Sequence, residues 1–259
     1  MKQTSLTSLA ILLAACSASA ENMLFNFGYT SRIYTGTNSP GHSAGDSSGT
    51  NWFNVYQDIN SGVKDENGNA TDLVLDFGTT TTDFGTTLDF SASTNSANYN
   101  MSASVDAGLA TLFDTNLGEG NAVRGGSGSL GIGLSITGLD AGEYVFYVTA
   151  FRGDTASGAE RDFNIFAGVS SDAITDFSSY SIGTITNTAG ISEWTVGDNY
   201  IKGSFTIDGV NDTFSLLSNS DSYIGVLTSL EIIAVPEPSV FGLLAGLGSL
   251  TLVATRRRR

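Results

Sequence analysis

Between residues 21 and 234 the sequence contains no apolar repeat with the 3.6-residue period of an amphipathic helix. Short apolar or alternating runs recur instead, and residues such as Gly, Asn, Asp and Ser separate them. Runs of this length between turn-forming residues are typical of β-strands. The pattern predicts strands at 23–29, 52–56, 72–77, 86–90, 130–137, 143–151, 162–167, 179–185, 200–207, 213–217 and 223–233. Only residues 105–117 indicate a short helix.

Many short strands joined by polar turns favour an all-β fold, and we expect a single two-sheet β-sandwich of the jelly-roll type over residues 21–234. Asn followed by Gly readily adopts positive φ at both central positions of a tight turn, so a hairpin-type turn is predicted at 65–69. A second tight connection is predicted at 138–142. The predicted core consists of Leu73, Leu75, Phe77, Ile132, Leu134, Ile136, Val145, Tyr147, Phe163, Ile165, Phe205, Ile207, Ile224, Val226 and Leu230.

Residues 1–20 have the organisation of a cleavable secretory signal peptide, including its N-terminal helix. Lys2 supplies a positive charge, residues 6–15 are apolar, and Ala18 and Ala20 provide the small residues of a cleavage site. We therefore expect the chain to be exported by Sec-type machinery.

Cys16 leaves a second interpretation of this segment open. The sequence Leu13-Ala14-Ala15-Cys16 also fits a lipobox, in which Cys16 is lipidated and anchors the mature N-terminus to a membrane. Because Cys16 is the only cysteine of the chain, the domain at 21–234 contains no disulfide.

Residues 235–259 form a three-part tail. A stiff proline-containing segment precedes 17 uncharged residues, 239–255, which are at the short limit for a helix that spans a bilayer. The arginines that follow would stay on the cytoplasmic side. The tail resembles the PEP-CTERM sorting signal of bacterial envelope proteins, with Pro236, Glu237 and Pro238 as the motif and Arg256, Arg257, Arg258 and Arg259 as the terminal cluster.

That resemblance implies recognition by an exosortase, a membrane enzyme that would cut near the motif. The tail would then be a temporary transmembrane anchor, and the protein would finish at the cell surface or in the extracellular matrix. Proteins of this kind are typically associated with exopolysaccharide.

The segment GLDAGEY at 138–144 carries a second resemblance. Followed by the apolar run 145–151, it is similar to a hairpin of galactose-binding-like and carbohydrate-binding jelly rolls. The segments 161–165 and 223–227 are similar to later strands of those modules. The resemblance implies an architecture, because one fold supports many functions.

The charge of the chain excludes one class of partner. The formal net charge is −15, and five of the eleven basic residues, Lys2 and the four terminal arginines, lie outside 21–234. The domain is therefore more acidic than the whole chain, and its surface repels the phosphates of nucleic acids.

Two short motifs imitate catalytic or nucleotide-binding sites without their structural context. GHSAG at 41–45 fits a nucleophile elbow, but no helix follows, and His42, the only histidine, lies inside the motif beside Ser43. GSGSLG at 126–131 fits a dinucleotide-binding loop, but a strand follows instead of a helix. We expect no catalytic residues, no enzyme activity and no required cofactor.

Two groups of residues indicate weaker binding hypotheses. Asp65, Asn67, Asn69 and Asp72 place oxygen atoms along one turn that could hold Ca²⁺, although their spacing is not that of an EF-hand. Aromatic side chains pack on the apolar faces of sugars, and the candidates are Trp52, Tyr56, Trp194 and Tyr200. A solvated turn and aromatic core packing are the competing interpretations.

Three functions remain open at this point. The first is a non-catalytic, exosortase-sorted envelope or matrix protein. The second is a carbohydrate-binding module attached to extracellular polysaccharide, and the third is a secreted hydrolase. An exposed aromatic surface would favour the second function, whereas two buried tryptophans would count against it.

Overall fold

In a computed structural model of the chain, the described residues are 22–28, 39–41, 51–91, 99–102, 119–125, 130–151, 162–186, 193–221 and 224–236. Their secondary structure is β throughout, as the sequence predicts. Each of the predicted strand segments overlaps at least one observed strand. The expected helix at 105–117, the signal helix at 1–20 and the membrane segment at 239–255 lie outside the described residues.

The strands form two large sheets and one small sheet. The five-stranded sheet has the order β11 (Ile201–Ile207), β8 (Gly142–Thr149), β14 (Ser229–Ala234), β1 (Met23–Phe27) and β2 (Phe53–Val55). The six-stranded sheet has the order β10 (Ser181–Ile185), β9 (Phe163–Ser170), β12 (Thr213–Asn219), β7 (Ile132–Thr137), β3 (Val74–Thr80) and β4 (Leu88–Asp89). The small sheet contains β13 (Val226–Leu227), β6 (Glu119–Arg124) and β5 (Tyr99–Ser102).

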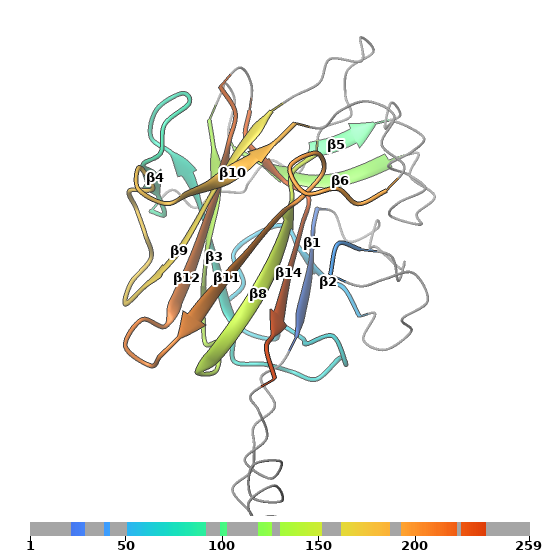
Figure 1. The fold of residues 1–259 in the computed structure, drawn as a ribbon, viewed down its shortest axis with the longest axis vertical. Helices are drawn as coiled ribbons and strands as arrows, with labels where there is room; N and C mark the ends of the chain where they lie inside the picture. Colours follow the sequence, from blue (N-terminus) through green and yellow to red (C-terminus); the bar gives the residue numbers. More distant parts are fainter. Residues whose placement is uncertain are drawn as a thin grey trace, which may run out of the picture.

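The two large sheets pack as a sandwich around one core (Figure 1). Among the paired strands of both sheets, only β1 and β2 run parallel. Phe214 of β12 shows how the sheets interlock. Its ring centroid lies 4.3 Å from that of Phe205 on β11 and 5.2 Å from that of Phe146 on β8. Burial of such aromatic rings from both sheets supplies much of the stabilising free energy.

One part of the predicted core is wrong. Tyr144, Phe146 and Val148 of β8 point into the sandwich, whereas Val145 and Tyr147 lie on the outer face and are half-buried. The segment 143–151 is apolar in both alternating phases, so its sequence does not reveal which set of side chains faces inward. The remaining predicted core residues are buried, apart from Phe205, which is partly buried and still packs against the core.

The hairpin-type turn at 65–69 is present, with one difference in its backbone. The NH of Asp65 donates to the carbonyl of Asn69 at 2.9 Å, and the NH of Gly68 donates to the carbonyl of Asp65 at 3.0 Å. Gly68 has a φ of +84°, but the expected positive φ at Asn67 is not found. A single left-handed glycine is therefore enough to reverse the chain here.

The connection at 138–142 is tight, but it does not form the hairpin that the resemblance implied. It joins β7 of the six-stranded sheet to β8 of the five-stranded sheet, so it crosses from one layer to the other. Leu139 is buried in the core, and the hydroxyl of Tyr144 donates to the carbonyl of Asp140 at 2.8 Å. These contacts fix the crossover between the two layers.

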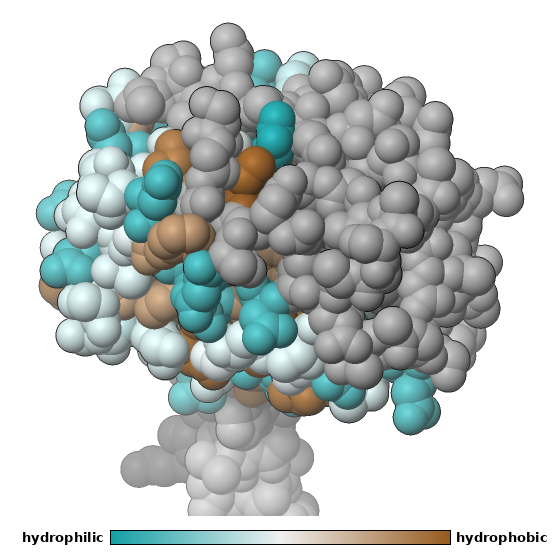
Figure 2. Space-filling model, turned by 90° about the horizontal axis from the view of Figure 1, so that it is seen from above, coloured by the Kyte–Doolittle hydropathy of each residue, from teal (hydrophilic) through white to brown (hydrophobic). Residues whose placement is uncertain are grey.

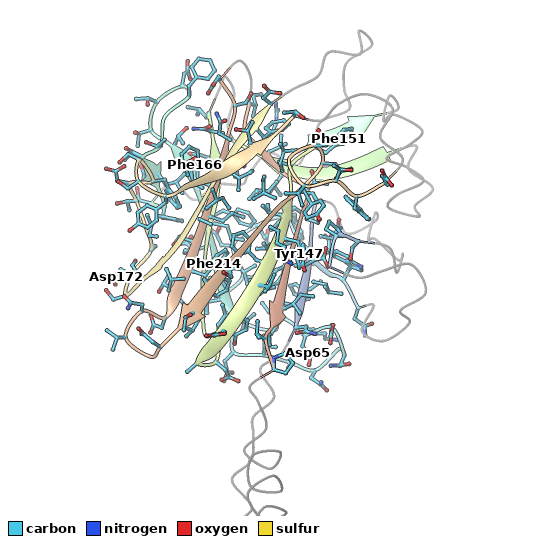
Figure 3. The ribbon with its side chains drawn as sticks, viewed as in Figure 1. Asp65, Tyr147, Phe151, Phe166, Asp172 and Phe214 are labelled. Carbon is cyan, nitrogen blue, oxygen red and sulfur yellow. The ribbon has the colours of Figure 1, made fainter. Side chains whose placement is uncertain are left out.

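The outer face of the six-stranded sheet is partly covered by the chain itself. A second cluster of buried side chains lies here, and Phe166, which Figure 3 labels beside β10, belongs to it. Residues 171–180 and β4 supply most of its other members, which are Leu88, Ile174, Phe177 and Leu217.

The chain leaves the sandwich through the C-terminal end of β14, at the bottom of Figure 1. The side-chain carbonyl of Asn22 accepts a hydrogen bond from the NH of Ala234 at 2.9 Å, so the first and last described segments are joined at this end. Within the described residues no helix is long and apolar enough to cross a membrane.

Candidate functional site

The structure brings together two of the four aromatic residues proposed to bind sugar. The rings of Trp194 and Tyr200 meet edge to face, with centroids 6.3 Å apart. The loop between them is held by Asn199, which is 2% exposed. Its Oδ1 accepts from the NH of Thr195 at 2.9 Å, and its Nδ2 donates to the carbonyl of Glu193 at 2.8 Å. The loop therefore holds both rings in place, and Trp194 is partly buried and packs against the hydrophobic core.

Tyr147, which the sequence placed in the core, joins this pair from the outer face of β8 (Figure 3). Its ring centroid lies 6.0 Å from that of Tyr200. Trp194, Tyr200 and Tyr147 are all half-buried, and we call these three residues the aromatic cluster. Because Ile201 pairs with Val148, the cluster lies toward the end of β8 that is remote from Ala234.

Lys202 is a further member of this surface that the sequence did not reveal. It is the direct cross-strand partner of Tyr147, and its Nζ lies 5.2 Å from the centroid of the Tyr147 ring. This distance is within the range of a cation–π interaction. The contact depends on the pairing of β8 with β11, which no local sequence pattern expresses.

A buried carboxylate lies on the other side of Tyr147. Glu231 of β14 is fully buried and accepts hydrogen bonds from Ser39 Oγ at 2.9 Å and from the NH of Gly41 at 3.2 Å. A Cβ atom on Gly41 would lie 3.2 Å from Cδ2 of Tyr147. Residues 39–41 therefore lie directly beside Tyr147 of the aromatic cluster. His42 and Ser43 of the GHSAG motif lie outside the described residues.

Trp52 and Tyr56 do not belong to this surface. They flank β2, whereas Tyr200 adjoins β11, and these strands are the two opposite edges of the five-stranded sheet. Trp52 is 9% exposed and packs in the core, and Tyr56 is half-buried. The four candidate aromatic residues therefore form two separate pairs.

Asp65, Asn67 and Asn69, three of the four proposed Ca²⁺ ligands, lie in an ordered turn. Nitrogen donors of this turn form hydrogen bonds with both carboxylate oxygens of Asp65. Asp65 Oδ1 accepts from the NH groups of Asn67 and Asn69 at 2.9 and 2.7 Å, and Oδ2 accepts from Asn69 Nδ2 at 2.8 Å. Burial acts to raise the pKa of Asp65, but these hydrogen bonds together outweigh it and hold the pKa below its usual value. The arrangement stabilises the turn through charge-assisted hydrogen bonds.

Two acidic residues lie close together at β3: Asp76 on the strand and Asp58 in the segment before it. Burial raises the pKa of Asp76, and repulsion from the nearby Asp58 raises it further. Asp58 Oδ1 also accepts from the NH of Phe77 at 3.0 Å. In the part of the chain that the structure describes, no group of three or more His, Cys, Asp or Glu side chains is placed to hold a metal ion.

A small pocket of about 180 Å³ lies near the opposite end of β8 from the aromatic cluster. Its lining includes Met23, Asp72, Asp140 and Tyr144. None of the four candidate aromatic residues lines this pocket.

No protein-family model matches the chain, and no curated protein matches it. The chain is similar in fold to parts of several solved structures. One is a family GH115 4-O-methyl-α-glucuronidase with specificity for decorated arabinogalactans, at 10% identity and a TM-score of 0.29 over 46% of this chain and 15% of that chain.

Two others come from Clostridium thermocellum. The CBM22-1 and GH10 modules of endo-1,4-β-D-xylanase 10B, complexed with xylohexaose, match at 19% identity and a TM-score of 0.29 over 47% of this chain and 23% of that chain. A family 35 carbohydrate-binding module matches at 13% identity and a TM-score of 0.25 over 44% of this chain and 88% of that chain. This chain thus spans less than a quarter of the first two proteins, and likenesses of this size carry no inference about its ligand.

Proposed function

We propose that the β-sandwich is a non-catalytic carbohydrate-binding module of the galactose-binding-like, jelly-roll type. The observation that carries the proposal is the aromatic cluster beside β8 and β11, in which Tyr147 lies on the outer face of the five-stranded sheet. Its rings are held by strand pairing and by the Asn199 loop, so little conformational freedom is lost when a ligand binds.

The chemistry around the rings suits a sugar. An aromatic face packs on the C–H groups of a pyranose ring, and neighbouring polar side chains bond its hydroxyls. Lys202 and Ser204 are exposed on the same face of β11. In the view from above, the coloured surface carries small hydrophobic areas among hydrophilic residues, and this view shows no broad apolar patch (Figure 2).

Replacing Trp194 and Tyr200 with alanine is expected to weaken polysaccharide binding by about tenfold or more, because aromatic anchors contribute most of the energy of such interfaces. Affinity gel electrophoresis of the purified chain against neutral and acidic polysaccharides measures the effect. Phe84→Ala is the control, since Phe84 is a 43% exposed ring in the β3–β4 connection and not part of the cluster.

Thermal unfolding of each variant checks that the fold is intact. If no polysaccharide retards the wild-type chain, or if the double variant is retarded as strongly as the wild type, the proposal is wrong.

We further propose that the protein is exported and sorted by an exosortase through its C-terminal tail. Support comes from the sequence of the tail and from the place where the folded domain ends. β14 ends at Ala234, the NH of Val235 still donates to the carbonyl of Glu143 at 2.8 Å, and Pro236 is exposed. The first motif residue is thus accessible directly beyond the last strand.

Replacing Pro236, Glu237 and Pro238 with alanine is expected to leave a longer form of the protein in the membrane fraction. Intact-mass analysis of membrane and medium fractions from the native host measures this result. Identical processing of the variant and the wild type would reject recognition of the motif. The same spectra show whether the mature chain begins at Glu21 or at a lipidated Cys16.

A further inference from the structure

Lys202 lies at the aromatic cluster, and its ammonium group contacts the Tyr147 ring. Its ammonium group lies 5.2 Å from the centre of the Tyr147 ring, and the side chain is exposed. It forms no ion pair with any of the described residues. The ring of Tyr147 therefore acts as a platform that holds a positive charge beside Tyr200, whose ring centroid is 6.0 Å from that of Tyr147.

The surrounding charge makes this placement informative. The chain has 26 acidic and 11 basic residues, so a lysine beside the rings is a local positive charge on an acidic protein. Glu231 of β14, the cross-strand partner of Tyr147 on its other side, is fully buried and accepts hydrogen bonds from Ser39 and Gly41. Asp198, in the loop between the two other rings, accepts from Thr186 Oγ1 at 3.2 Å. Among the residues that the structure describes, Lys202 is the cationic side chain that contacts the cluster.

We infer that the ligand of the aromatic cluster is an acidic polysaccharide whose uronic acid carboxylates meet Lys202. The inference rests on the carbohydrate-binding function proposed above. In this arrangement a pyranose ring packs on Trp194 and Tyr200, and Tyr147 is a positioning residue that keeps the ammonium group of Lys202 at the edge of that ring. A ligand carboxylate would form a charge-assisted hydrogen bond with the exposed ammonium group, and this ion pair would stabilise the complex.

A local cation is needed because the rest of the domain opposes such a ligand. The net negative charge repels polyanions at long range, and this repulsion is screened beyond about 8 Å at physiological ionic strength. A direct contact with Lys202 acts inside that distance. A neutral glycan cannot form this ion pair, so the contact favours acidic over neutral sugars of the same shape.

The test uses polygalacturonate, polyglucuronate and alginate, each compared with its own carboxyl-reduced, neutral form. The purified chain is expected to bind at least one acidic polymer about tenfold more tightly than its reduced form. Lys202→Gln should abolish this preference, so that the acidic polymer and its reduced form bind with equal affinity, and Lys202→Arg should retain it. Isothermal titration calorimetry at fixed ionic strength measures both affinities.

Lys64→Gln is the matched control, because Lys64 is an exposed lysine beside the 65–69 turn and its loss changes the net charge equally. An equal loss of preference in Lys64→Gln and Lys202→Gln would show that long-range charge is responsible and would overturn the inference. Equal binding of acidic and reduced polymers, still lost in the Trp194 and Tyr200 double variant, would overturn the inference alone. If neither form of any polymer binds, the carbohydrate-binding function fails as well.

Discussion

Replacing Phe214 with alanine is expected to lower the free energy of unfolding by about 4 kcal/mol, the largest effect of any substitution considered for this domain. Phe214 is fully buried and belongs to the six-stranded sheet, but its ring contacts Phe205 and Phe146 of the five-stranded sheet. Its removal leaves a cavity between two sheets whose backbones are fixed by their ladders, so the space cannot close easily.

Urea unfolding followed by tryptophan fluorescence measures this change. Phe214→Leu keeps most of the volume and should cost roughly half as much. Phe84→Ala removes a ring that is 43% exposed, and it should cost less than about 1 kcal/mol. If Phe214→Ala and Phe84→Ala have the same effect, Phe214 does not join the two sheets in the way described.

Gly138→Ala is expected to destabilise the domain by about 3 kcal/mol, because two penalties act at one position. Gly138 has a φ of +88°, which a residue with a side chain adopts only at a cost of about 1–2 kcal/mol. A Cβ atom would also lie 2.6 Å from the carbonyl oxygen of Asp72. That oxygen belongs to the backbone, so the crossover between the two layers has to shift.

The control for Gly138 isolates the conformational penalty. Gly209 has a φ of +81°, and a Cβ atom there would meet nothing within 4 Å. Gly209→Ala should therefore cost only about 1 kcal/mol. Thermal or urea unfolding of the two variants compares them directly. Equal destabilisation would mean that the contact with Asp72 contributes nothing.

The strands could be predicted from sequence because each has a local signature. Apolar runs bounded by turn residues located the strands of both large sheets. The signature fails where a run is apolar in both phases, as in β8, because only the opposing sheet decides which side chains turn inward. It also fails for β5 and β6, whose sequences YNMS and EGNAVR contain little apolar alternation. Pairing between distant segments defines these strands.

The sequence predicted only part of the candidate site. Trp194 and Tyr200 are two of the four aromatic candidates that the sequence indicates, and the structure shows that their rings meet. Tyr147 and Lys202 lie far apart along the chain, and the register of β8 on β11 brings them together. Trp52 shows the opposite error, since a tryptophan in a core and a tryptophan on a binding surface look the same in sequence.

The position of β14 has a mechanical consequence. It lies between β8 and β1, is antiparallel to both, and its C-terminal end is the exit of the chain. A pull on Pro236, resisted by a polymer held near the far end of β8, would act along β14 and would load both ladders in shear. Ladders loaded in shear must break many hydrogen bonds together, whereas a strand peeled from an edge loses them one by one. If the tail is anchored and the domain binds a polymer as proposed, the central position of β14 would let the sandwich resist tension between the two attachment points.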